Sequence, residues 1–160
     1  AEDQVVCGDA MPDCSGTFGI NMDYRGIFLN MSFYYQFGGQ TYNQTLVDRV
    51  ENADVGLNVD KRIYNAVWKK PGDRVDFSYN PYRLTKPSSR FVQDLNELRL
   101  SSLNVGYDFR HCAFLKKSRL QQLKASFYMD DVFRASTVKT ERGLTYPFAR
   151  TFSFSLQATF

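Results

Sequence analysis

The last ten residues, Thr151 to Phe160, alternate without a break between two kinds of side chain. Every second residue is apolar and the residues between are small or polar; the apolar set is Phe152, Phe154, Leu156, Ala158 and Phe160. Because successive side chains of a strand point to opposite faces, this pattern predicts a β-strand with one apolar and one polar face. In a soluble sandwich the apolar face would cover a core, and in an outer-membrane barrel it would face lipid. The strand by itself leaves both architectures open.

Composition removes several other classes of protein. Aromatic residues make up 16% of the 160 residues, which is high for a small soluble domain, and the net charge is only +3. The basic residues are scattered, so the sequence does not indicate a nucleic-acid-binding surface. No apolar run reaches the roughly 18 residues that a membrane-spanning helix needs. We find no nucleophile–base pair, phosphate-binding glycine loop or cysteine metal cluster, and His111 stands alone, so we predict no enzyme, no cofactor and no metal site.

Five segments have the alternation of strands, and they are 17–24, 27–37, 97–110, 120–129 and 151–160. The tight turn Arg25–Gly26 joins the first two into a hairpin. A slip of the apolar phase at Ser101–Ser102 predicts a β-bulge in the third. Short connections alternate with long ones, 38–95 and 130–149, and this segregation of loop lengths favours an outer-membrane barrel over a sandwich.

The polar faces of these strands carry the side chains expected of a wet lumen. The candidate lumen-lining residues are Asn30, Ser32, Tyr34 and Gln36, and a role as wall filler is equally compatible with them. Five strands do not close a barrel in lipid, because the smallest natural barrels have about eight and open edges are not tolerated in hydrocarbon. The fold class that we predict is therefore all-β, a transmembrane antiparallel β-barrel segment that belongs to a larger barrel.

The connection 38–95 contains the candidate binding residues. Four aromatic side chains, Tyr64, Trp68, Tyr79 and Tyr82, offer flat faces that can stack on sugar rings; packing of the loop against the barrel rim is the alternative. Apolar residues between 58 and 68 recur near helical spacing, with Asn58 or Asp60 as a cap, and predict a helix. Near the start of the chain, Cys7 and Cys14 flank a turn and either form a disulfide in an oxidising compartment or remain free thiols.

Several stretches, in this order along the chain, carry a family resemblance. They are VVCGDAMPDCSGTFGINMDYRGIFLNMSFYYQFGG, YNQTLVDRVENAD, NVDKRIYNAVWKKPGD, SSRFVQDLNELRLSSLNVGYDF and GLTYPFARTFSFSLQATF. Together they resemble the carboxy-terminal barrel segment of SusC/RagA-type TonB-dependent outer-membrane transporters of Bacteroidetes, over essentially the whole chain. The resemblance implies a barrel of about 22 strands with an amino-terminal plug. It also implies a SusD-like surface lipoprotein as a lid, TonB as the driver, and import of glycans or peptides.

The resemblance also orients the predicted strands. Residues 1–160 form the carboxy-terminal part of the barrel, 38–95 and 130–149 become extracellular loops, and the aromatic loop residues become candidates for contact with substrate or lid. Phe152, Phe154, Leu156 and Phe160 then look like the signal that the barrel-assembly machinery reads. The chain lacks the plug and the first strands, so its partners include the remainder of the barrel and the lipid bilayer of the bacterial outer membrane.

Two alternatives stay open at this point. The first is a secreted β-sandwich that acts as a carbohydrate-binding module through the loop aromatics. The second is a surface structural subunit that is completed by a strand of its partner.

Overall fold

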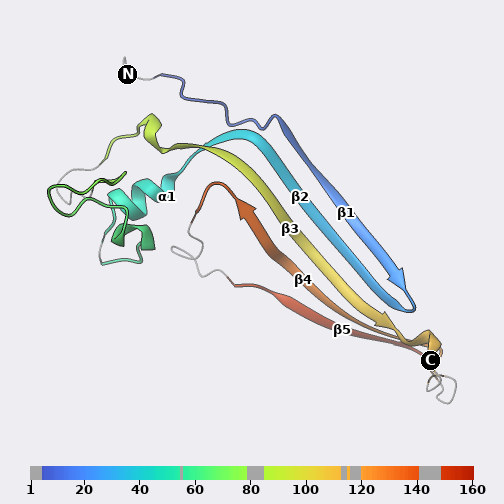
Figure 1. Ribbon diagram of the computed structural model, residues 1–160. Coiled ribbons are helices and arrows are strands. Elements are labelled where there is room, and N and C mark those ends of the chain that lie inside the picture. The colour runs from blue at the N-terminus through green and yellow to red at the C-terminus, as the bar shows by residue number, and fades with distance from the viewer. Residues whose placement is uncertain (1–4, 55, 79–84, 113–114, 116–119, 141–148) are drawn as a thin grey trace. The chain divides into compact units, whose positions relative to one another are not determined.

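The computed structural model of the protein describes residues 5–54, 56–78, 85–112, 115, 120–140 and 149–160. The fold is all-β, with one five-stranded antiparallel sheet whose strands lie side by side in chain order (Figure 1). The strands are β1 (Cys14–Tyr24), β2 (Ile27–Tyr42), β3 (Val92–Asp108), β4 (Gln122–Ser136) and β5 (Phe152–Thr159). In the described parts, no helix is long and apolar enough to cross a membrane.

The chain divides into two compact units, each assembled from segments that are distant in the sequence. The loop unit contains Ala1–Asp13, Gly38–Leu95 and Thr137–Phe148. The sheet unit contains Cys14–Phe37, Asn96–Ser136 and Ala149–Phe160.

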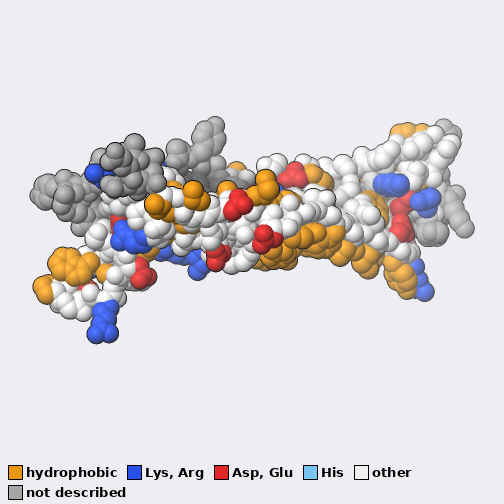
Figure 2. Space-filling model, turned by 90° about the horizontal axis from the view of Figure 1, so that it is seen from above, with side chains coloured by type: hydrophobic (Ala, Val, Ile, Leu, Met, Phe, Trp, Pro, Cys, Tyr) orange, Lys and Arg blue, Asp and Glu red, His pale blue; other side chains and the backbone are white. Residues whose placement is uncertain are grey.

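In the sheet unit, the pairing of β1 with β2 explains the alternation in the sequence. Phe18 lies opposite Phe33 and Ile20 opposite Met31, whereas Asn21 lies opposite Asn30. Residues directly opposite each other share a face, so the pairing separates an apolar from a polar side. The rings of Phe18 and Phe33 stack with their centroids 4.8 Å apart. Figure 2 shows hydrophobic side chains gathered in a band along the strands.

The irregularity predicted at Ser101–Ser102 is present between β3 and β4. Leu100 lies opposite Phe133 and Ser102 opposite Asp130, so two residues of β4 face the single residue Ser101. The surplus residue is therefore on β4, where Asp131 has a φ of 49°. An aspartate tolerates this left-handed conformation better than most residues, which explains why β4 accommodates the bulge.

The strands extend beyond the segments predicted for them. β2 continues to Tyr42, β3 begins at Val92 and β4 continues to Ser136, so the predicted connections 38–95 and 130–149 are too long. The extension of β2, 38–42, lacks apolar alternation, whereas in β4 the alternation resumes after the bulge, with Phe133 opposite Leu100 and Ala135 opposite Leu98. Backbone hydrogen bonds accompany the extension of β2: the amide of Gln40 donates to the carbonyl of Asp9 at 2.8 Å.

The loop unit has its own hydrophobic core. Helix α1 (Gln44–Leu46) continues as the π-helical turn η1 (Val47–Glu51), and both contribute to the core. The buried members of this core are Leu46, Val47, Val50, Val67 and Phe91. The helix predicted at 58–68 is only a short 3-10 turn, η2 (Lys61–Tyr64), although the side chain of Asp60 does cap it by accepting from the amide of Arg62. A further 3-10 turn of this unit is η3 (Ser89–Phe91), whereas η4 (Phe109–His111) belongs to the sheet unit.

Candidate binding surfaces

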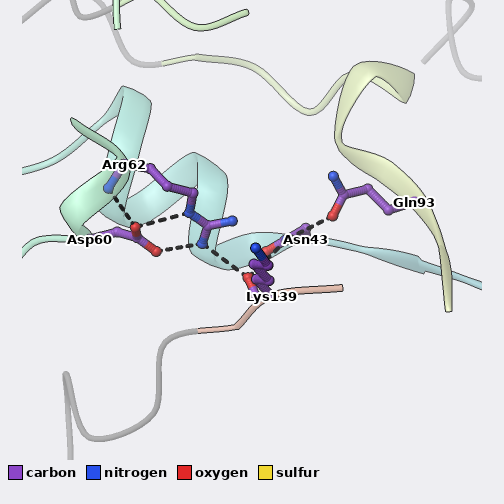
Figure 3. Close-up of polar contacts among 5 residues, drawn as sticks. All are labelled: Asn43, Asp60, Arg62, Gln93 and Lys139. Atoms are coloured by element: carbon purple, nitrogen blue, oxygen red, sulfur yellow. Dashed lines mark hydrogen bonds and ion pairs between the residues drawn. The ribbon is translucent and has the colours of Figure 1, made fainter. Parts of the chain in front are cut away.

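A polar network fixes the segments of the loop unit to one another (Figure 3). The carbonyl oxygen of Lys139 accepts from the Nη2 of Arg62 at 3.0 Å and, at the longer distance of 3.5 Å, from the Nδ2 of Asn43. The same Nδ2 donates to the Oε1 of Gln93 at 2.8 Å. Arg62 also forms an ion pair with Asp60. The start of the β4–β5 connection is thereby tied into the connection between β2 and β3.

Glu51 forms a second buried anchor in the loop unit. Its side chain is fully buried and pairs with Arg90, whose side chain is 47% exposed. Its Oε2 accepts from the hydroxyl of Thr85 at 2.8 Å, and its Oε1 lies 3.4 Å from the amide nitrogen of Ser78. A buried carboxylate that is paired and hydrogen-bonded in this way stabilises one conformation of its neighbours. Glu51 is thus a structural residue that positions the segments around it.

The lowered pKa of Asp60 predicts that acid destabilises the loop unit. Burial raises the pKa of its carboxyl, but the hydrogen bonds and charge of Arg62 outweigh burial and hold this pKa below the ordinary value of 3.8. A lowered pKa in the folded state stabilises the fold above the ordinary pKa, and this contribution disappears as the pH falls through the lowered value. We expect resistance to urea to be constant near neutral pH and to fall below about pH 4. Trp68 is the single tryptophan of the chain, so its fluorescence can follow unfolding of the loop unit.

The control for this experiment is Asp60→Asn, which removes the titrating group. The variant should be less stable than the parent at pH 7, and its stability should change less between pH 5 and pH 3. Identical pH profiles of parent and variant would contradict the assignment of the acid-sensitive step to Asp60.

Two of the four predicted aromatic candidates, Tyr64 and Trp68, lie within the part of the chain that the structure describes. Tyr64 is 67% exposed and Trp68 is 48% exposed, so neither side chain is buried in the core of the loop unit. The backbone beneath Trp68 is held by a hydrogen bond from its amide to the carbonyl of Phe77, at 2.9 Å. Tyr79 and Tyr82 lie outside the described residues. The two aromatic rings that the structure does describe are available at the surface of the loop unit.

A hollow of about 570 Å³ opens on another part of the loop unit. Its walls combine the apolar side chains of Tyr42, Val47, Leu57 and Pro87 with polar groups from η1 and its neighbours. The volume falls within the range of small-ligand sites. Neither Tyr64 nor Trp68 lines it, so the sequence-predicted candidates and the hollow are separate features.

The four predicted lumen residues lie together on the polar face of the sheet unit. Asn30, Ser32, Tyr34 and Gln36 alternate along β2, and their partners on β1 are Asn21, Gly19, Thr17 and Ser15. The hydroxyl of Tyr34 donates to the Oε1 of Gln36 at 2.7 Å. The structure brings these four residues onto one face, as their spacing predicts; their role in a lumen remains a proposal.

The polar face also carries a set of charged side chains that the sequence did not predict. We call it the arginine cluster; it consists of Arg99 and Arg134 with their neighbours Tyr34 and Glu97. Arg99 and Arg134 lie directly opposite each other on β3 and β4. The guanidinium carbon of Arg99 lies 5.2 Å from the centre of the Tyr34 ring, which places Arg99 beside the predicted lumen residues. The Nη2 of Arg134 donates to the Oε2 of Glu97 at 2.7 Å.

A signal for the arginine cluster exists in the sequence but is weak. Glu97 and Arg99 occupy alternate positions of one strand, which puts both charges on one face. Arg134, however, lay in a segment that the sequence analysis predicted to be a loop. Only the register between β3 and β4 reveals that the two arginines meet.

The predicted assembly signal lies on an edge strand. Phe152, Phe154, Leu156 and Phe160 are between 63% and 81% exposed. β5 is the last strand of the sheet and pairs with β4, where Phe154 lies opposite Phe127. The two cysteines of the possible disulfide, Cys7 and Cys14, are both free thiols with exposed side chains. The structure thus does not contain the bridge that the sequence left open.

Comparison with known proteins finds similar chains of one kind. No family model matches the chain. It is 26% identical, over an alignment of 179 residues, to TonB-dependent receptor P3 of Formosa agariphila, with 99% of this chain and 17% of the receptor covered. Two solved structures of the RagAB peptide importer have the same fold. The open-open state gives a TM-score of 0.66 at 16% identity and covers 94% of this chain and 17% of the neighbour. The closed-closed state gives a TM-score of 0.68 at 16% identity and covers 97% of this chain and 18% of the neighbour.

These similarities extend over nearly the whole of this chain but over less than a fifth of each relative. None of them points to an enzyme. The comparisons agree with the resemblance carried by the sequence motifs: the chain is similar throughout to a segment of SusC/RagA-like TonB-dependent transporters.

Proposed function

We propose that this chain is the carboxy-terminal part of the barrel of an outer-membrane TonB-dependent transporter that imports large nutrients. The observation that carries the proposal is the two-faced sheet, whose apolar side exposes large side chains on several strands. Phe18, Met22, Phe133 and Phe154 are between 46% and 70% exposed. Soluble monomers rarely expose an apolar surface of this kind, whereas lipid-facing strands require it.

The proposed orientation rests on the contrast between the tight Arg25–Gly26 turn and the long connection between β2 and β3; the two later connections, 109–121 and 137–151, are of similar length. In this proposal the Arg25–Gly26 turn and the β3–β4 connection face the periplasm, and the connections that follow β2 and β4 face the cell exterior. Short turns on the periplasmic side and long loops outside are the rule in such barrels. The turn and the end of β3 lie at the same edge of the sheet, where the amide of Asp108 donates to the carbonyl of Gly26 at 2.7 Å.

The proposed substrates are peptides or glycans, and the proposed partners are the rest of the barrel with its plug, a SusD-like lipoprotein and TonB. The name of the RagAB peptide importer supports the peptide class, and the exposed rings of Tyr64 and Trp68 suit either class. In this proposal the loop unit contacts the lipoprotein or the substrate outside the membrane. A secreted sandwich is less well supported, because a sandwich needs a second packed sheet and the described residues form a single one.

Detergent dependence tests the proposal. The isolated chain should require detergent or lipid to stay in solution, because the apolar side of the sheet has no core to cover. The complete polypeptide that contains it should fractionate with the outer membrane and migrate differently on gels before and after heating, as folded barrels do. An isolated chain that is monomeric in plain buffer and melts cooperatively there would overturn the proposal.

A further inference from the structure

We propose that Arg99 and Arg134 bind a carboxylate group of the transported ligand, so that the substrate is an acidic peptide or an acidic glycan. The inference rests on the proposed transport function and adds the charge of the substrate to it. It starts from the arginine cluster on the polar face, where the two guanidinium groups come from residues directly opposite each other on β3 and β4.

The charge balance of the cluster is incomplete. Like charges that lie directly opposite on neighbouring strands destabilise a sheet. Glu97 neutralises one of the two arginines, since it is the carboxylate bonded to Arg134. Among the residues that the structure describes, no carboxylate is paired with Arg99, whose recorded contact is with the ring of Tyr34. One positive charge is left, and a single carboxylate balances it.

The hydrogen-bonding capacity of the cluster is also incomplete. The Nε atoms of Arg99 and Arg134 are both shielded from solvent and have no hydrogen-bond partner in the structure. A shielded donor without a partner is costly, so such groups are expected to find an acceptor. Arginine presents its N–H groups as a planar fork that matches the two oxygens of a carboxylate. A carboxylate would supply the acceptor that these N–H groups lack and would also balance the remaining charge.

Each arginine is already held in place by one neighbour. Glu97 fixes the guanidinium of Arg134, and the ring of Tyr34 lies beside that of Arg99. The side chain of Arg134 is nevertheless 28% exposed, so a group that comes from outside can reach it. A site that is positioned before its ligand arrives loses little entropy on binding. The exposed part of the Arg134 side chain is therefore where we place the carboxylate of the ligand.

The test uses the complete transporter in detergent micelles and two matched pairs of probes. One pair is triglutamate against triglutamine, and the other is trigalacturonate against galactotriose. We expect at least one acidic probe to bind about tenfold or more tightly than its neutral counterpart, since charge-assisted hydrogen bonds are usually worth at least that factor. Arg99→Gln and Arg134→Gln should each weaken the acidic probe by about tenfold and leave the neutral one unchanged.

Two further variants sharpen the result. Arg99→Lys retains the charge without the fork and should keep part of the preference. Lys124→Gln removes a positive charge from a residue that lies opposite Asp108, at the other end of the strand pairing, and should leave the preference intact.

Several outcomes would overturn the inference. These are equal binding of acidic and neutral probes, no binding of either acidic probe, or a preference that the arginine variants do not change. Variants that lower the thermal midpoint without changing probe binding would mean that an internal carboxylate occupies the cluster, and the inference would then be wrong. Heat-dependent gel migration of the same preparations reports separately on the barrel, so failure of the proposed function is recognised independently.

Discussion

Replacement of Phe154 by arginine is expected to block assembly of the complete barrel. Phe154 is 70% exposed and lies opposite Phe127 on the apolar side of β4 and β5. If this side faces lipid, a charge there costs roughly 2–4 kcal/mol near the middle of the membrane. Such a loss is a large fraction of the stability of a typical protein. Heat-dependent gel migration and outer-membrane fractionation of the full-length variant measure the effect.

The matched control is Ser153→Arg, one residue earlier in the same strand. Ser153 lies opposite Tyr128, on the other side of the sheet, where the proposal places a wet lumen. This variant should assemble at close to the parental level, because an arginine there remains hydrated. Equal defects in both variants would indicate a local requirement of β5 that has nothing to do with lipid, and equal success of both would count against lipid exposure.

Phe91→Ala is expected to unfold the loop unit. The side chain of Phe91 is fully buried and packs among the other members of the core of that unit. Its ring lies 5.9 Å from that of Tyr42 and 6.5 Å from that of Phe77, measured between centroids. Removal of a buried phenylalanine typically costs about 3–5 kcal/mol. The variant should show faster amide hydrogen exchange in 42–78 and a changed fluorescence of Trp68.

Leu57→Ala is the control, because the side chain of Leu57 is 61% exposed and its loss leaves no cavity. It should exchange like the parent. The sheet unit of Phe91→Ala should also remain protected if the loop unit has a core of its own. Simultaneous loss of protection in both units would show that the loop unit does not fold as a separate element.

The two-faced part of the sheet was predictable because a local pattern specifies it. The alternation in 27–37 and 151–160 reflects a real difference between the two sides of the sheet, and a single strand displays it completely. The bulge near Ser101 was predictable for the same reason, because the change of apolar phase lies within a single strand. The ends of the strands were not predictable, because the extension to Tyr42 carries no such pattern and the bulge at Asp131 interrupts the phase of β4 before Phe133.

The loop unit was harder to predict because its elements depend on contacts distant in the sequence. The segment 44–51 is too short to be helical by propensity alone, and its apolar residues Val47 and Val50 are covered by Val67 and Phe91. The arginine cluster was missed for a related reason: Arg99 and Arg134 meet only through the register of β3 with β4. Pairing across strands is a property of the fold, and no window of the sequence contains it.

The unpaired outer edges of β1 and β5 affect when the barrel can assemble. Among the described residues, β1 has only β2 as a neighbour and β5 has only β4. In a strand of eight residues such as β5, about half of the amide groups then point away from the sheet without a partner. In the proposed barrel each such group would cost several kcal/mol in hydrocarbon, so the outer margins would have to be paired before, or while, the sheet enters lipid. Insertion is thus expected to be a single late event for the whole barrel, and until then this chain presents two templates for unwanted association.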